Sequence, residues 1–236
     1  MTPEYKYVGE ELDVFSLARN WKNYWGSLIR PYLGKHVLEV GAGIGANTEL
    51  LCSSEQERWI SLEPDESLSE TITERLEQHP YRHIVDVRVG SIGSISLDEK
   101  FDSILYIDVL EHIQDDRREL ELASKLLKSG GTLIVLAPAH QRLYSPFDRS
   151  VGHFRRYSID SLLSVGPPSL NVLKLIYVDA AGLLASSANL LYLRQSLPTA
   201  GQIRFWDRYL VPLSARIDPW LRFRLGKTVL GFWRKA

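Results

Sequence analysis

The chain has 236 residues, of which 44% are apolar and 24% are charged, and this balance excludes a disordered or collagen-like protein. This length suits one domain with a sizeable core. Cys52 is the only cysteine, which excludes an internal disulfide and a cysteine-based zinc cluster. We expect a cytoplasmic protein, because low cysteine fits a reducing compartment and residues 1–10 lack the apolar core of a secretory signal. No apolar run reaches the ~18 residues of a transmembrane span.

The net charge of -1 hides an asymmetry between the two parts of the chain. Residues 1–139 carry 14 Lys and Arg against 24 Asp and Glu, whereas residues 140–236 carry 14 against 5. The net charges are therefore -10 and +9. A cationic second part could attract an anionic substrate or an anionic membrane surface. The charges could equally solvate two faces that pair within the fold, and both interpretations stay open.

The first 139 residues alternate between helical and strand-like segments. Residues 11–31 have a helical pattern, and apolar runs typical of buried strands follow at 36–40, 58–62, 84–89, 101–107 and 132–137. Helical segments at 44–53, 65–78 and 115–128 separate these runs, and Gly130-Gly131 is expected to stop the last helix. The alternation predicts an α/β fold with a parallel sheet covered by helices on both faces.

The pattern changes after Pro138. Residues 140–158 form a polar, arginine-rich loop, and a strand is expected at 172–178. Helical segments follow at 180–193 and at 203–217, the second broken by Pro212, before a last strand at 226–233. We interpret residues 180–222 as a helical insertion. The chain is then one domain with an N-terminal helical lid (1–34), a cofactor-binding half (35–139) and a substrate-side half (140–236).

Three alternating glycines, Gly41, Gly43 and Gly45, follow the first strand and lead into a helix. Such a turn lets the backbone approach a ligand closely while the helix presents its N-terminus. Taken alone the turn is ambiguous, because Ala46 also completes a dinucleotide-binding fingerprint. Glu63 lies 22 residues after Gly41, where a carboxylate could accept hydrogen bonds from the ribose of any adenosyl cofactor. It could also cap the helix that follows.

Glu39 lies two residues before the first glycine, inside the strand. A buried carboxylate is costly unless it is paired or hydrogen-bonded. The α-amino group of a methionine-like moiety would offset that cost, and a dinucleotide has no such ammonium. Glu39 therefore favours a methionine-derived cofactor.

Four motifs together narrow the family. They are VLEVGAGIG at 37–45, LEPD at 62–65, FDSILYIDVLEHI at 101–113 and GGTLIVLAPA at 130–139. In this order and spacing, residues 20–139 resemble the class I S-adenosylmethionine-dependent methyltransferases, and residues 226–235 resemble their closing strand. The resemblance implies a Rossmann-like, doubly wound sheet of seven strands, mostly parallel with an antiparallel last strand. It also implies S-adenosylmethionine as the cofactor and S-adenosylhomocysteine as the product.

The resemblance also implies a role for each matching position. The methionine and ribose part of the cofactor would contact Glu39, Gly41, Ala42, Gly43 and Gly45, and Glu63 would hold the ribose hydroxyls. The adenine would lie near Pro64, Ser91 and Ile92, although many family members have Asp where this chain has Ser91. The sulfonium would face Asp108, Val109 and Leu110. Residues 19–21 resemble an N-terminal lid over the cofactor.

The loop at 140–157 follows the fifth strand, at the sheet edge where open α/β folds bind ligands. Displacement at a sulfonium methyl needs proximity and exclusion of water, and a hydroxyl acceptor also benefits from a base. We expect the base to be His153 or, second, His140, with Tyr157 beside them. These side chains could equally brace the loop against the sheet. Residues 145–157 resemble a segment found in a bacterial subset of these methyltransferases, and no metal site is expected.

The insertion interleaves arginines with aromatic residues at 204–209 and 220–224. One interpretation is a cap over a small-molecule or lipid-linked acceptor, anionic in character, with peripheral membrane contact. A homodimer interface and ordinary core packing are the other interpretations. No nucleic-acid partner is expected, because the overall charge is near zero and no RNA-binding module is recognisable.

The predicted function is methyl transfer from S-adenosylmethionine to such an acceptor, at oxygen. Two alternatives stay open: an NAD(P)-dependent oxidoreductase that uses the same glycine turn, and a non-catalytic S-adenosylmethionine-binding protein.

Overall fold

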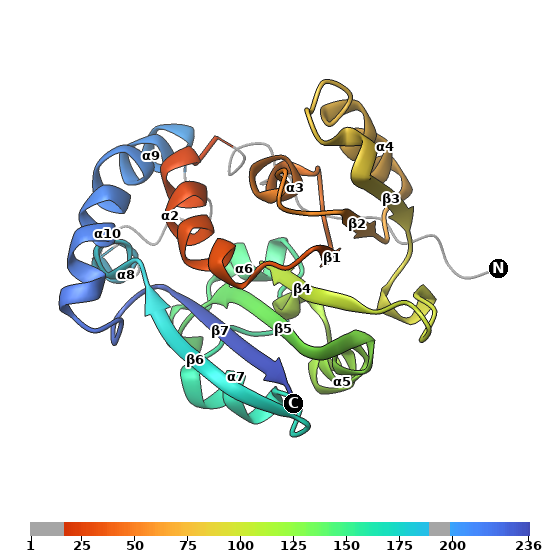
Figure 1. Cartoon of the computed structure of the whole chain (residues 1–236). Coiled ribbons are helices and arrows are strands. Elements are labelled where there is room, and N and C mark those ends of the chain that lie inside the picture. Colours follow the sequence, from red (N-terminus) through yellow and green to blue (C-terminus); the bar gives the residue numbers. More distant parts are fainter. Residues whose placement is uncertain (1–16, 189–198) are drawn as a thin grey trace.

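A single sheet of seven strands forms the centre of the molecule (Figure 1). The computed structural model describes residues 17–188 and 199–236. The strand order is β3-β2-β1-β4-β5-β7-β6. Pairings among β1 to β5 are parallel, whereas β7 runs antiparallel between β5 and β6, as predicted. The strands are β1 (His36–Val40), β2 (Arg58–Glu63), β3 (Val85–Val89), β4 (Phe101–Ile107), β5 (Leu127–Pro138), β6 (Leu170–Val178) and β7 (Thr228–Lys235).

Helices cover both faces of the sheet because alternate residues of each strand point to opposite sides. On β1, Val37 joins one core cluster and Leu38 the other. The first core packs under α2 (Arg19–Ile29), α3 (Ala46–Leu51), α4 (Glu66–Arg75), α9 (Ala200–Phe205) and α10 (Val211–Trp220). The second packs under α5 (Asp116–Leu126) and α7 (Ile159–Val165). The expected doubly wound α/β architecture is confirmed.

The expected end of the helix at 115–128 and the expected start of the strand at 132–137 are both wrong. Helix α5 ends at Leu126, and Gly130 and Gly131 lie inside β5 instead of stopping a helix. They fall where the pairing of β4 with β5 slips between Phe101 and Ser103, and Gly130 adopts a φ of 76°. Glycine accepts this conformation at an irregular point in a strand without steric cost.

Pro212 does not break the second helix of the insertion. A π-helical turn, η7 (Trp206–Leu210), joins α9 to α10, and the N–H of Val211 bonds to the carbonyl of Trp206. The wider turn lets the chain continue through a proline that cannot donate its own hydrogen bond. Helix α8 (Ala180–Ala188) covers the start of the expected segment at 180–193, whose end lies outside the described residues.

Buried aspartates attach the insertion to the N-terminal helix. Asp218 of α10 accepts hydrogen bonds from the Tyr24 hydroxyl at 2.6 Å and from the backbone N–H of Asp179 at 2.7 Å. Asp207 of η7 accepts from the backbone N–H of Trp21 at 2.9 Å. Among the helices described, none is long and apolar enough to cross a membrane.

Candidate active site

The glycine turn lies at the carboxyl end of β1. Gly41, Gly43 and Gly45 have φ values of 68°, 56° and 75°, which side chains rarely tolerate. The N–H of Gly41 bonds to the carbonyl of Leu62 at 2.8 Å, which ties the turn to β2. A Cβ atom at position 41 would also lie 2.6 Å from Cγ2 of Val109. The turn is therefore pressed against the segment that follows β4.

Glu63 ends β2 and faces this turn. Its carboxylate accepts hydrogen bonds from the N–H groups of Gly43 at 2.8 Å and Asp65 at 3.1 Å. Burial raises the pKa of Glu63 to about 7, against the lowering effect of these two N–H groups. The N-terminus of α4 is capped by Asp65, which accepts from the N–H groups of Ser67 and Leu68. Glu63 is therefore not the cap of this helix, and it stays available to a ligand at the turn.

Glu39 is buried next to the glycine turn and is only partly satisfied. Its Oε2 atom accepts from Oγ1 of Thr48 at 2.6 Å and from Nε1 of Trp59 at 3.2 Å. Its Oε1 atom, in contrast, has no hydrogen-bond partner among the described residues. Burial raises the pKa of Glu39 to about 7, although the bonds from Thr48 and Trp59 lower it. An orphaned buried acceptor at this position fits an ammonium donor.

Lys22 of α2 is a site residue that the sequence analysis missed. Its Nζ atom donates to Oδ1 of Asn47, just after the turn, at 3.4 Å. Burial lowers the pKa of Lys22 to about 8, and the nearby Glu39 opposes this shift. Lys22 lies inside the expected helical lid (1–34) but just after residues 19–21, the positions that the resemblance singled out. Helical periodicity shows no sign of this role, because only the packing of α2 brings Lys22 to the turn.

The residues expected around the adenine and the sulfonium lie at the ends of β2, β3 and β4. The N–H of Gly90 bonds to the carbonyl of Glu63, which holds the start of the 91–92 loop beside the end of β2. Asp108 leaves β4 with a φ of 54°, an uncommon value outside glycine that often marks functional sites. Leu110 differs from expectation, because its side chain is buried in the second core instead of facing a ligand. The exposure of the others varies, with Ser91 and Asp108 exposed, Pro64 and Val109 intermediate, and Ile92 and Ala42 buried.

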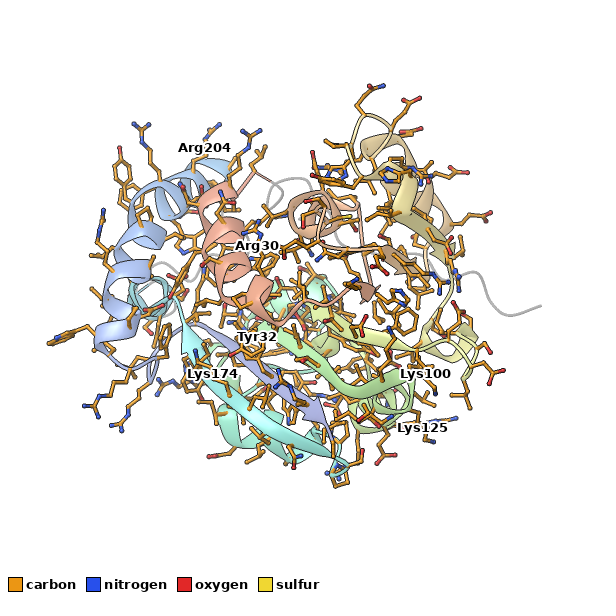
Figure 2. The ribbon with its side chains drawn as sticks, viewed as in Figure 1. Arg30, Tyr32, Lys100, Lys125, Lys174 and Arg204 are labelled. Carbon is orange, nitrogen blue, oxygen red and sulfur yellow. The ribbon has the colours of Figure 1, made fainter. Side chains whose placement is uncertain are left out.

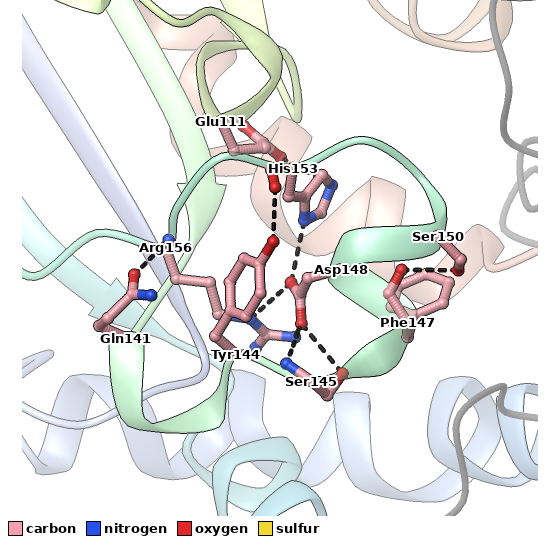
Figure 3. A network of polar contacts seen from close by, with 9 residues as sticks. All are labelled: Glu111, Gln141, Tyr144, Ser145, Phe147, Asp148, Ser150, His153 and Arg156. Atoms are coloured by element: carbon pink, nitrogen blue, oxygen red, sulfur yellow. Dashed lines mark hydrogen bonds and ion pairs between the residues drawn. The ribbon is translucent and has the colours of Figure 1, made fainter.

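The arginine-rich loop carries an organised polar cluster (Figure 3). It contains two short helices, η5 (Gln141–Leu143) and α6 (Pro146–Ser150). The buried carboxylate of Asp148 contacts Nδ1 of His153 at 2.9 Å and accepts from Nε and Nη2 of Arg156 at 2.7 and 2.9 Å. Although burial opposes it, these partners hold the pKa of Asp148 well below its usual range. Asp148 therefore fixes the ring of His153 and leaves its Nε2 atom for other contacts.

The other nitrogen of His153 points toward Glu111, three residues after Asp108. Its Nε2 atom lies 3.9 Å from Oε1 of Glu111, whose carboxylate oxygens are buried and accept no hydrogen bond from the described residues. Burial raises the pKa of Glu111 well above its usual value, and burial also lowers that of His112 to about 4. The ligand atoms of Glu111, His112 and His153 all lie within 4.8 Å of one another. This spacing would suit a metal ion as well as a proton-transfer group.

The two other expected catalytic residues occupy different environments. The Nε2 atom of His140 bonds to the carbonyl of Gly226 at 2.9 Å, and its ring stacks on Tyr177. Tyr157 is 1% exposed, and its hydroxyl donates to Asp116 at 2.7 Å. Burial and the Asp116 carboxylate raise the pKa of Tyr157 well above its usual value. Tyr157 thus anchors the loop to α5, and we do not retain it as a base.

These features define a Rossmann-like domain in which the glycine turn, Glu39 and Glu63 gather at the carboxyl ends of β1 and β2, next to the segment that follows β4. Open α/β sheets bind ligands at this edge. Residues 38–133 match a family model described as a methyltransferase domain. This part of the chain is therefore similar to methyltransferase domains, and the mostly parallel seven-stranded sheet agrees with that similarity.

Several known proteins with similar sequences are named as methyltransferases. A ubiquinone biosynthesis O-methyltransferase from Coxiella burnetii (strain Dugway 5J108-111) is 32% identical over 152 residues, which are 56% of this chain and 64% of that protein. A mitochondrial ubiquinone biosynthesis O-methyltransferase from Dictyostelium discoideum is 23% identical over 55% of this chain and 42% of its own length. The chain thus spans 42% to 64% of the length of these relatives.

Solved structures share the fold at low sequence identity. The N-methyltransferase NodS from Bradyrhizobium japonicum, bound to S-adenosylhomocysteine, is similar with a TM-score of 0.58 and 15% identity, covering 92% of this chain and 86% of that chain. The [4+2]-cyclase SpnF is similar with a TM-score of 0.63 and 16% identity, covering 90% and 80%. Because a cyclase shares this fold with a methyltransferase, the fold alone does not define the reaction.

The residues present fit S-adenosylmethionine. The unpartnered oxygen of Glu39 suits the α-ammonium, Lys22 suits the carboxylate, and Glu63 suits the ribose hydroxyls. A dinucleotide offers an anionic pyrophosphate to Lys22 but has no ammonium group for Glu39. The cofactor expected from the sequence therefore agrees with the chemistry of this site.

Proposed function

We propose that this protein transfers a methyl group from S-adenosylmethionine to a hydroxyl oxygen of a small-molecule or lipid-linked acceptor. The observation that carries the proposal is that two features occur together. Glu39 and Lys22 lie beside the glycine turn, and Asp148 orients His153 in the loop that follows β5. Two relatives named as O-methyltransferases support oxygen as the acceptor atom.

When bound, S-adenosylmethionine supplies an electrophilic methyl group on a sulfonium sulfur. Lys22, Glu39 and Glu63 would hold the amino-acid and ribose parts of the bound cofactor, and Asp108 and Val109 lie on the other side of the glycine turn. Such fixed placement converts a bimolecular displacement into a step within one complex. The carbon–sulfur bond breaks as the carbon–oxygen bond forms, and S-adenosylhomocysteine leaves.

His153 is the proposed general base. Asp148 accepts the Nδ1 proton of His153, which leaves the Nε2 lone pair to take the acceptor's hydroxyl proton. His140 is a weaker candidate, because its Nε2 atom already donates to the carbonyl of Gly226. Arg142 lies on the same loop, and its charge supports an acceptor of anionic character, whereas that of Arg156 is paired with Asp148.

The test uses labelled methyl transfer with a panel of acceptors: a catechol, an alkyl-substituted catechol, an aliphatic amine and a carboxylate. We expect label on a catechol and a loss of about 100-fold or more in kcat/KM for His153→Gln. Label on the amine alone, with His153→Gln unchanged, would contradict oxygen transfer with a histidine base. Binding of S-adenosylhomocysteine without transfer to any acceptor would favour the non-catalytic alternative.

The oxidoreductase alternative has a separate readout. Under it, a nicotinamide cofactor would raise the melting temperature and S-adenosylhomocysteine would not. We expect the reverse, because only the methionine moiety provides an ammonium for Glu39 and a carboxylate for Lys22.

A further inference from the structure

The outer side of the insertion exposes a row of large apolar side chains. Helix α9, the turn η7 and α10 form one continuous helical run from residue 200 to 220. Phe205, Tyr209, Leu213 and Trp220 are 57%, 55%, 45% and 83% exposed. Their spacing of four, four and seven residues places them on one side of the run. The opposite side, which includes Trp206, is buried against the domain.

Exposed arginines surround this row. Over residues 200–225, all of which are described, five arginines are exposed: Arg204, Arg208, Arg216, Arg222 and Arg224. The two aspartates in the same range, Asp207 and Asp218, are buried and bonded inward to α2. Side chains ending in nitrogen project outward along this edge of the molecule, where Arg204 is labelled (Figure 2). The exposed charge of the segment is therefore entirely positive.

A hollow next to the row is also cationic. It has a volume of about 400 Å³ and lies between the start of α2 and α9. Arg19, Arg204 and Arg208 line it together with the apolar Leu17 and Ile203, the polar Asn20 and one acid, Asp207, whose carboxylate bonds to the backbone of α2. Three guanidinium groups around a partly apolar hollow suit a phosphate group that carries an apolar chain.

We propose that this surface, made of Arg204, Phe205, Arg208, Tyr209, Leu213, Arg216 and Trp220, docks on a bilayer that contains anionic phospholipids. Phenyl, phenol and indole rings gain free energy at the boundary between headgroups and acyl chains, and arginines attract anionic headgroups. In water, a row of exposed apolar side chains costs free energy, and a bilayer would remove that cost. The inference goes beyond the proposed methyl transfer and does not depend on it, since docking requires neither cofactor nor acceptor.

The bilayer is favoured over other occupants by the combination of charge and apolar groups. A nucleic acid would use the arginines but leave Leu213 and Trp220 without a matching apolar environment. A second copy of this chain would bring five arginines against five, which is repulsive without exposed acids to pair them. Both occupants are outcomes that the experiment below can detect.

The experiment is cosedimentation of the full chain with vesicles, without cofactor, at about physiological ionic strength. We expect binding to vesicles of phosphatidylcholine mixed with phosphatidylglycerol and little binding to phosphatidylcholine alone. Reversing three arginines (Arg204→Glu, Arg208→Glu and Arg216→Glu together) should weaken binding about 100-fold or more, since each contributes to attraction at the surface. The pair Phe205→Ser and Trp220→Ser should weaken it at least about tenfold.

The matched control changes an exposed arginine and an exposed leucine elsewhere. Arg118→Glu with Leu97→Ser keeps the same chemistry on a different surface and should bind vesicles as the wild type does. Melting temperatures close to the wild-type value would show that every variant is folded.

Three results would overturn the proposal. The first is wild-type protein that binds neither kind of vesicle. The second is binding to the mixed vesicles that survives arginine reversal. The third is binding that the Phe205 and Trp220 changes leave intact while heparin competes fully, which would indicate a soluble polyanion. A chain that elutes as a dimer, and that the Phe205 and Trp220 changes convert to a monomer without vesicle binding in either form, would assign the surface to a second copy.

Discussion

A Cβ atom built on Gly41 lies 2.6 Å from Cγ2 of Val109, so the turn after β1 and the segment after β4 meet where only a glycine fits. Gly41 also has a φ of 68°. Two independent constraints therefore act on one residue. The positive φ and the close contact with Val109 fix the distance between the glycine turn, which would hold the methionine moiety, and the segment after β4, which would face the sulfonium.

Gly41→Ala should lower the free energy of unfolding by about 2–4 kcal/mol, from the positive φ and from overpacking against Val109. Gly130→Ala is a matched control, because Gly130 has a φ of 76° but no atom within 4 Å of a built Cβ. It should cost only about 1 kcal/mol. Adding Val109→Ala to Gly41→Ala should recover part of the loss. Equal losses in urea unfolding for the two glycine variants would show that the contact with Val109 is unimportant.

The contribution of Glu39 and Glu63 to the stability of the ligand-free protein should fall as the pH rises from about 5 to about 7.5. Glu39 and Glu63 are buried with pKa values raised to about 7, so the folded chain holds protons that the unfolded chain has already lost. Stability from these groups is fully present below the unfolded pKa and decreases through the folded one, by at most about 3 kcal/mol for each. Glu39→Gln should flatten this pH dependence in urea unfolding. An identical slope in the variant would contradict a titrating Glu39.

Lys22→Met should weaken binding of S-adenosylhomocysteine by about tenfold, because a charge-assisted bond to its carboxylate is lost. Binding of methylthioadenosine, which lacks the amino acid, should not change. Because burial lowers the pKa of Lys22 to about 8, the wild type should also lose affinity for S-adenosylhomocysteine as the pH rises through 8. Calorimetry with both ligands gives the comparison, and equal weakening of the two would mean that Lys22 only supports α2.

Dialysis against a chelator should leave methyl transfer unchanged if His153 acts as a base. In the same assay, His112→Ala should cost less than about tenfold, because burial lowers its pKa to about 4 and so makes its ring a weak base. A loss of activity that Zn²⁺ restores, and that His112→Ala reproduces, would instead identify Glu111, His112 and His153 as metal ligands.

Local sequence patterns were sufficient to predict the sheet. The strands β1 and β4 begin and end where their apolar runs do, because strands covered on both faces need continuous apolar sequence. The glycine turn and Glu63 could also be predicted, because each is defined by a sequence pattern only a few residues long. Gly130 misled because glycine marks a strand irregularity as readily as the end of a helix.

The rest of the site depends on contacts between distant parts of the chain. Lys22 is 17 residues before Glu39, and only the packing of α2 brings it to the turn. In the sequence, Asp148 has the position of an ordinary capping residue at the start of a helix. In the structure it also orients His153 and binds Arg156. Tyr157 has the residue type of a catalytic group, but its burial against Asp116 gives it a supporting position. The periodicity of apolar residues in the sequence does not distinguish a residue of the site from one with a supporting role.

Calorimetric titration with S-adenosylhomocysteine tests the central claim most directly. The wild type should show saturable binding, and Glu63→Ala should weaken it by about 10- to 100-fold through loss of charge-assisted bonds to the ribose. Glu66→Ala, an exposed neighbour in the first turn of α4, should bind as the wild type does. No binding of S-adenosylhomocysteine, or binding that Glu63→Ala leaves unchanged, would contradict the assignment of this edge of the sheet to the methyl donor.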